Sequence, residues 1–181
     1  SAASDVYKRQ MMDLLYPLIK PYVHQIQIGL EIDSWEVGMQ NWTSGFEGEF
    51  CERTGYDLIK YLPAMTGKIV GSKEMTERFL WDIRRVQADL LADNYYGEFR
   101  NLCNQYGLVS YCEPYDRGPM EELQIGSRVD GVMGEFWNGL SAIFQNNLMM
   151  RRTTKLASSI AHINGQKVVG AEAYTSEPES G

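Results

Sequence analysis

Residues 107–115, with the sequence Gly-Leu-Val-Ser-Tyr-Cys-Glu-Pro-Tyr, contain the pattern that decides the fold of this chain. The apolar run at residues 108–112 is typical of a short buried strand, and Pro114 prevents its continuation as a central strand. The run is followed directly by a carboxylate, Glu113, and two positions later by an aromatic residue, Tyr115. A buried strand therefore ends in a polar and aromatic pair.

The same pattern occurs three more times. The apolar run at residues 26–32 is followed by Trp35 and Glu36, the run at 129–133 by Glu135 and Trp137, and the run at 168–171 by Glu172 and Tyr174. Helical patterns separate most of these runs, which favours parallel βα units over an antiparallel meander. In a parallel barrel every strand delivers its carboxyl end to the same mouth. We therefore expect an α/β fold in which the four acids converge.

The helical patterns have recognisable limits. Apolar residues spaced three and four apart predict an amphipathic helix over residues 11–19, which Pro21 stops. Ser72 is the expected N-cap of a long helix whose apolar face runs from Met75 to Leu90. A five-residue step before Tyr95 predicts either a kink or two helices that end at Gly107. The last predicted helix covers residues 140–163.

Composition excludes several functional classes. The chain has 181 residues, of which 44% are hydrophobic, and 24 acidic against 17 basic side chains give a net charge of -7. These values are typical of one soluble globular unit. The basic residues do not form the concentrated cluster that nucleic-acid binding requires. A nucleic acid is therefore not an expected partner. No apolar run approaches the roughly 20 residues of a membrane span, so a membrane is not an expected partner either.

Cysteine and histidine are too few for a zinc site. The three cysteines form no CxxC pair and the chain has only two histidines, which argues against a zinc site and a Ser-His-Asp triad. The sequence also lacks the glycine-rich loops that bind nucleotides. We therefore expect no organic cofactor.

Convergent carboxylates beside aromatic rings suit carbohydrate chemistry. Hydrolysis of a glycosidic bond needs one carboxylic acid that protonates the leaving oxygen and one carboxylate that activates water or attacks carbon. Additional acids can bind sugar hydroxyls or a hard cation such as calcium. Asp33 is a further candidate, although it faces away from Glu36 unless the chain bends at Ser34. The candidate aromatic platforms are Trp35, Trp42, Tyr115, Trp137 and Tyr174.

Several ordered motifs are similar to those of one enzyme family. They are Asp-Ser-Trp-Glu-Val-Gly at 33–38, Asn-Trp-Thr at 41–43, Arg-Thr-Gly-Tyr-Asp at 53–57, Tyr-Leu-Pro-Ala at 61–64, Arg-Phe-Leu-Trp-Asp at 78–82, and the strand-end motifs at 113–115, 134–137 and 171–176. Together they resemble glycoside hydrolase family 106, the α-L-rhamnosidases. The resemblance covers residues 11–176.

The resemblance implies a (β/α)8 TIM barrel of a larger bacterial glycosidase, of which residues 11–181 supply about the fourth to seventh strands. Glu36 would be the general acid and Glu172 the base of an inverting mechanism, with Glu135 as the alternative base. Glu113 and Glu135 would line the sugar pocket, and calcium is implied without named ligands. The parent enzyme would be periplasmic or secreted, and its signal would lie upstream.

Residues 1–10 differ in kind from the rest. Residues 2–10, Ala-Ala-Ser-Asp-Val-Tyr-Lys-Arg-Gln, resemble the translation of a transposon adapter used in sequencing libraries, which suggests a metagenomic origin. We expect them to be non-native, a disordered natural terminus being the alternative.

Two other functions stay open: a non-catalytic carbohydrate-binding protein on the same scaffold, and an inactive fragment. Half a barrel without the missing parts of its parent chain exposes sheet edges, so it should aggregate or stay partly molten.

Overall fold

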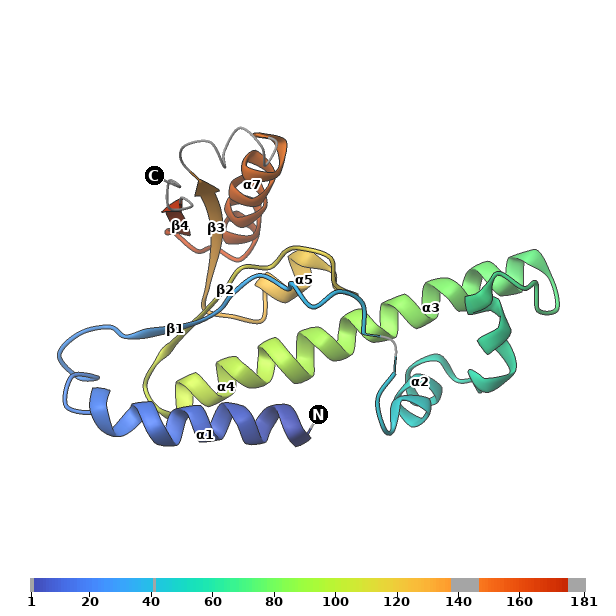
Figure 1. Ribbon diagram of the computed structural model, residues 1–181, viewed down its shortest axis with the longest axis horizontal. Helices are drawn as coiled ribbons and strands as arrows, with labels where there is room; N and C mark the ends of the chain where they lie inside the picture. The colour runs from blue at the N-terminus through green and yellow to red at the C-terminus, as the bar shows by residue number, and fades with distance from the viewer. Residues whose placement is uncertain (1, 41, 138–146, 176–181) are drawn as a thin grey trace, which may run out of the picture.

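Four parallel strands in the order β1-β2-β3-β4 form a curled half-barrel, as shown in Figure 1. The computed structural model describes residues 2–40, 42–137 and 147–175. The strands are β1 (Gly29–Ile32), β2 (Val109–Cys112), β3 (Gly131–Trp137) and β4 (Gly170–Thr175). Each pairs in parallel with its neighbour in the chain. The predicted α/β class with partial barrel topology is confirmed.

Helices precede and connect the strands. They are α1 (Ala2–Ile19), α2 (Phe46–Thr54), the 3-10 helix η1 (Ile59–Thr66), α3 (Lys73–Leu91), the π-helix η2 (Ala92–Gly97), α4 (Glu98–Gln105), α5 (Glu122–Gly126) and α7 (Asn147–Ile163). The Ser72 hydroxyl accepts a hydrogen bond from the Met75 amide at 3.1 Å, so the predicted N-cap is confirmed. Residues 140–146 of the last predicted helix lie outside the described residues.

The five-residue step in the apolar pattern corresponds to a π-helical turn. The helix continues from α3 through η2 into α4 without a break, and η2 carries the i to i+5 geometry. Neither a pair of separate helices nor a simple kink describes it. Gly107 follows α4 with φ +70°, a conformation that glycine adopts without steric cost.

Strands β3 and β4 extend further than the sequence predicts. The expected ends, near Met133 and Ala171, are wrong, because the two strands continue pairing with each other beyond those points. Glu135 pairs directly with Glu172, so both acids lie within the strands. Glu36 and Glu113 come after the ends of β1 and β2, as predicted.

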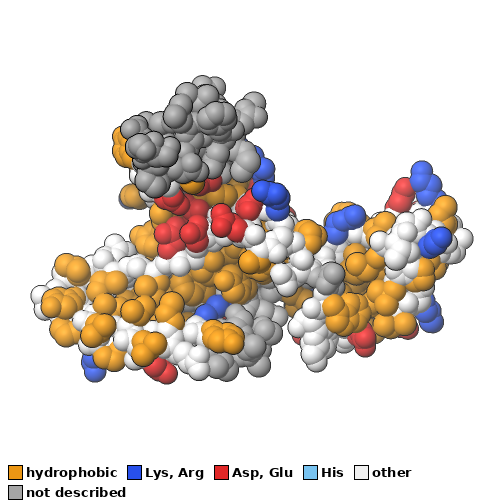
Figure 2. Space-filling view, viewed as in Figure 1, with side chains coloured by type: hydrophobic (Ala, Val, Ile, Leu, Met, Phe, Trp, Pro, Cys, Tyr) orange, Lys and Arg blue, Asp and Glu red, His pale blue; other side chains and the backbone are white. Residues whose placement is uncertain are grey.

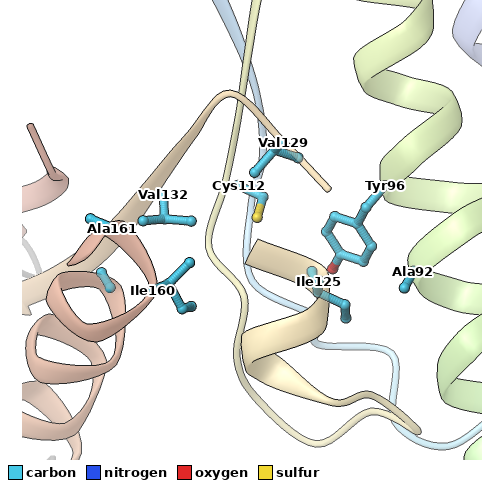
Figure 3. Packing of buried hydrophobic residues seen from close by; sticks show 9 residues of the cluster. Ala92, Tyr96, Cys112, Ile125, Val129, Val132, Ile160 and Ala161 are labelled. Atoms are coloured by element: carbon cyan, nitrogen blue, oxygen red, sulfur yellow. The ribbon is translucent and has the colours of Figure 1, made fainter. Parts of the chain in front are cut away.

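Three clusters of buried apolar side chains hold the fold together. The first lies between the sheet, η2, α5 and α7, and Figure 3 shows Val132 beside Ile160 in it, with Tyr96 reaching towards Ile125. The second joins α2 and η1 to α3, and the third joins α1 to α4 and the start of β2. Each cluster removes apolar surface from water, the main favourable contribution to folding.

Helix α1 begins at Ala2, so it includes the residues predicted to be non-native, and that assignment stays a prediction. Within the parts of the chain that the structure describes, no helix combines the length and apolar character needed to cross a bilayer.

Candidate active site

Six carboxylates gather at the carboxyl ends of the strands. Glu31 lies in β1, Asp33 and Glu36 follow it, Glu113 follows β2, and Glu135 and Glu172 lie in β3 and β4. Figure 2 shows acidic side chains concentrated beside the sheet. Their charges act on one another. Burial is the main cause of the raised pKa of Glu135, and the charges of Glu172, Asp33 and Glu36 raise it further. The predicted convergence of acids therefore occurs in the structure.

Asp33, Glu113 and Glu172 form the tightest group. One carboxylate oxygen from each lies within 4.8 Å of the other two. Asp33 follows the end of β1 at Ile32, and its Oδ1 accepts a hydrogen bond from the Ser34 amide at 2.6 Å. Asp33 therefore joins Glu113 and Glu172, whereas its orientation relative to Glu36 stays a prediction.

Glu113 is the most unusual member of the cluster. Its side chain is only 1% exposed, and the nearby Tyr115 hydroxyl acts on it as a hydrogen-bond donor without the geometry of a full hydrogen bond. Burial raises the pKa of Glu113 to about 8, the Tyr115 hydroxyl opposes this shift, and the charges of Glu135, Asp33 and Glu31 add to it. A buried carboxylate with so little hydrogen bonding is costly, so this position favours either a bound proton or a compensating ligand.

Glu135 and Glu172 are each oriented by a neighbouring side chain. The Trp137 indole donates to Glu135 Oε2 at 3.0 Å, and the Thr175 hydroxyl donates to Glu172 Oε1 at 2.5 Å. The buried hydroxyl of Thr153 in α7 contacts the backbone of Glu135 on both sides, accepting from its amide at 3.3 Å and donating to its carbonyl at 3.2 Å. These contacts fix the two acids on the sheet.

Glu36 occupies an exposed position at the rim. The preceding residue, Trp35, is anchored in two ways: its backbone amide donates to the Tyr115 carbonyl at 3.1 Å, and its indole donates to the Gly38 carbonyl at 2.6 Å. A Cβ at Gly118 would lie 2.6 Å from the Trp35 ring, so the ring packs where only glycine fits without a shift. Trp35 therefore fixes the backbone that carries Glu36.

The predicted aromatic residues occupy different environments. Tyr115 is buried, and burial together with the Glu113 carboxylate raises the pKa of its hydroxyl. Tyr174 is exposed at a register shift between β3 and β4, where it has φ +62° and contacts the Phe136 ring edge-to-face at 4.9 Å. Bulges of this kind re-aim side chains near active sites. Trp42 lies apart from the acids and lines a separate pocket.

Three residues of the site were not predicted from the sequence. They are Glu31, Thr153 and Thr175, which contribute a nearby charge, a backbone contact and an orienting hydroxyl. Glu31 and Thr175 adjoin predicted motifs, so proximity alone could have suggested them. Nothing in the sequence pattern indicates that Thr153, within a helix, reaches Glu135.

The chain matches known proteins over most of its length. The family model described as alpha-L-rhamnosidase, glycoside hydrolase family 106, matches residues 7–180. A curated protein of Formosa agariphila, named "Putative beta-glucuronidase", is 50% identical over 144 residues, which make up 80% of this chain and 12% of that protein. The solved structure of a rhamnosidase from Novosphingobium sp. PP1Y is 33% identical with a TM-score of 0.67, covering 80% of this chain and 14% of that one.

Proposed function

Since the chain belongs to glycoside hydrolase family 106, we propose that its strand-end acids form the catalytic centre of an α-L-rhamnosidase that removes terminal rhamnose from plant-type glycans. The observation that carries the proposal is the convergence of six carboxylates from four parallel strands. Such an arrangement provides the acid and the base that glycoside hydrolysis requires.

In the proposed reaction Glu36 donates a proton to the leaving oxygen while a water molecule, deprotonated by Glu172, attacks the anomeric carbon. The exposed rim position of Glu36 suits an acid that must reach the leaving group. The Thr175 hydroxyl holds Glu172 in one orientation, which a base requires in order to position water. The outcome is inversion at the anomeric carbon.

Glu135 fits a substrate-binding role better than the base role. Its pKa is raised by burial and by neighbouring carboxylates, and one of its oxygens already accepts from Trp137. A carboxyl that keeps its proton for more of the time can donate a hydrogen bond to a sugar hydroxyl. Glu113, with its higher pKa, can do the same from the floor of the cluster.

The same residues fit a calcium ion. Asp33, Glu113 and Glu172 offer only oxygen donors, one from each lying within 4.8 Å of the other two, and such a set fits a hard cation. When bound, the ion would neutralise the cluster and attract sugar hydroxyls. Glu172 is both the proposed base and a proposed ligand, so calcium affinity is measured on Asp33→Asn and Glu113→Gln, which keep the base and should bind calcium more weakly.

The acid cluster favours rhamnose over a uronic acid at this centre. Rhamnose is neutral, whereas the carboxylate of a glucuronide would be repelled by the ionised members of the cluster, and no Lys or Arg forms a salt bridge with any of the six acids in the described part of the chain. The proposed substrate therefore differs from the glucuronide in the name of the Formosa relative.

We further propose that the chain acts as part of a longer bacterial protein that is periplasmic or secreted. The chain spans 12% of the curated relative and 14% of the solved structure that it matches. The outer edges of β1 and β4 pair with no other described strand. Leu14 and Leu18 of α1 are largely exposed, which suits a surface that further chain covers.

The test uses the complete protein that contains this chain. We expect hydrolysis of 4-nitrophenyl α-L-rhamnoside and not of 4-nitrophenyl β-D-glucuronide. Glu172→Gln should lower kcat about 100-fold or more. The loss of kcat in Glu36→Gln should be smaller on the aryl substrate than on a rhamnosyl disaccharide, because nitrophenolate leaves with little help from an acid. Glu77→Gln, on the exposed side of α3, is the control.

Wild-type rates in both the Glu36 and Glu172 variants would refute the assignment. A loss in Glu135→Gln that exceeds the loss in Glu172→Gln would transfer the base role to Glu135. Rhamnose binding in calorimetry without turnover would instead identify a non-catalytic carbohydrate-binding protein on this scaffold.

A further inference from the structure

A pocket distinct from the acid cluster lies where the chain crosses from β1 over α3 towards α2, the crossing visible in Figure 1. Its volume is about 460 Å³, within the range of roughly 300 to 1,000 Å³ typical of small-molecule sites. One wall is the segment that includes Trp42 and Phe46, and the other is the helix from Gln87 to Tyr95. None of the six clustered acids lines it.

The lining of the pocket suits a neutral, hydroxylated ligand. The exposed ring of Trp42 lies beside the buried Phe46 and beside Tyr95, whose ring has the Lys8 ammonium 4.2 Å from its centroid. Three amide side chains, Gln40, Gln87 and Asn94, complete the polar part of the lining. Glu49, the charged residue among the lining side chains, already pairs with Arg53 at 3.4 Å. Aromatic faces accept the apolar side of a sugar ring, and amides both donate to and accept from its hydroxyls.

The walls of the pocket are held in place by specific contacts. The Gln87 side chain donates to the Gln40 carbonyl at 3.2 Å, which ties the crossing segment to α3. Trp42 is 46% exposed and meets Phe46 edge-to-face at 5.5 Å. Asn94 and Tyr95 lie in the π-helix η2, and π-helical turns occur frequently at functional sites.

The pocket adjoins the proposed general acid. Tyr95, which lines the pocket, contacts Trp35 edge-to-face at 5.8 Å, and Trp35 directly precedes Glu36. Gln40, on the opposite wall, follows Glu36 by four positions. The leaving group of a glycosidase is the part of the substrate that receives the proton of the general acid. The pocket therefore borders the segment that carries the proposed acid.

We infer that this pocket binds the leaving-group portion of the substrate, and that this portion is a neutral sugar. The inference rests on the proposed function, since it takes Glu36 as the acid. It adds a substrate class that the acid cluster alone does not specify: a rhamnoside whose rhamnose is attached to an uncharged sugar.

The test compares two substrates of the complete protein: a mixture of (1→2)-, (1→4)- and (1→6)-linked α-L-rhamnosyl-D-glucoses, and 4-nitrophenyl α-L-rhamnoside. Trp42→Ala should lower the ratio of kcat/KM on the disaccharides to kcat/KM on the aryl substrate about tenfold or more. Asn94→Ala, which keeps the aromatic rings, should lower it several-fold and serves if Trp42→Ala does not fold. Trp81→Ala is the matched control, because Trp81 is 64% exposed on α3 and does not line the pocket. An unchanged ratio in both pocket variants would overturn the inference.

A binding experiment separates failure of the inference from failure of the proposed function. Saturation-transfer NMR would measure the binding of methyl β-D-glucopyranoside and of D-glucuronate to the wild type and to the same variants. Binding of the neutral glycoside that Trp42→Ala abolishes and Trp81→Ala keeps supports the pocket even if no rhamnoside is hydrolysed. Binding that survives Trp42→Ala and Asn94→Ala, or a preference for glucuronate, overturns it even if the enzyme is active.

Discussion

Replacing Glu113 by glutamine should change how the stability of the protein depends on pH. Glu113 is 1% exposed and its pKa is raised from the ordinary 4.5 to about 8, mainly by burial. Because the folded state binds this proton more tightly than the unfolded state, the stabilisation is fully present below pH 4.5. It is lost as the pH rises from 4.5 to about 8. Glutamine is nearly isosteric with glutamate and has no such proton to lose.

The magnitude follows from the two pKa values. At about 1.4 kcal/mol for each pH unit, the difference between 4.5 and about 8 corresponds to about 5 kcal/mol. Relaxation and entry of water lower this figure, so about 2 to 5 kcal/mol is the expected range. Relative to the wild type, Glu113→Gln should therefore gain this free energy of unfolding between pH 4.5 and pH 9.

The assay is urea unfolding of the 181-residue chain at pH 4.5, 7 and 9 in a buffer with a chelator, followed by tryptophan fluorescence. A cooperative transition would also contradict the expectation that the isolated chain stays partly molten. The exposed-site variant Glu77→Gln is the control. At pH 9, added calcium should restore stability to the wild type and not to Glu113→Gln, because the cation compensates the buried charge. Parallel pH profiles for the wild type and Glu113→Gln would refute the reasoning.

Three other predictions concern packing and hydrogen bonds. Ile160→Ala should lower the free energy of unfolding by about 2 to 5 kcal/mol, since Ile160 is 1% exposed, whereas Ile163→Ala on the same helix, 67% exposed, should change it by less than about 0.5 kcal/mol in thermal melts. Ser72→Ala should cost about 0.5 to 2 kcal/mol through loss of the helix cap, and Ser72→Asp, which keeps an acceptor, should restore most of it in the same melts. Thr153→Val should lower the free energy of unfolding by about 1 to 3 kcal/mol and lower kcat, because the Glu135 amide and carbonyl lose their hydrogen bonds with the Thr153 hydroxyl. A Thr153→Ser variant that behaves like Thr153→Val would contradict this explanation.

The sequence predicts the fold class well because its evidence is local. Each strand is a short apolar run and each acid lies next to one, so the parallel arrangement and the meeting of the acids follow from general rules of α/β folds. The cap at Ser72 is equally local, since it joins Ser72 to Met75, three positions further along the same helix start.

Features that depend on pairing between distant segments could not be predicted in the same way. The lengths of β3 and β4 depend on each strand having the other as a partner, which places Glu135 opposite Glu172. The burial of Tyr115 and the close approach of Asp33 to Glu113 depend on how the chain bends after β1 and β2. A pattern of residue types contains no information on that bend.

Because of the π-helical turn between α3 and α4, one continuous helix packs against two separate hydrophobic clusters with differently oriented faces. Phe79 and Ile83 point into the core shared with α2, whereas Phe99 and Leu102 point into the core shared with α1. An α-helix turns by about 100° at each residue, so deleting one residue within η2 would rotate everything beyond it by that angle. Phe99 and Leu102 would then leave their core although no apolar side chain had been changed. Insertions and deletions at this turn should therefore be far less tolerated than substitutions. The number of residues in this continuous helix is more tightly constrained than their identity.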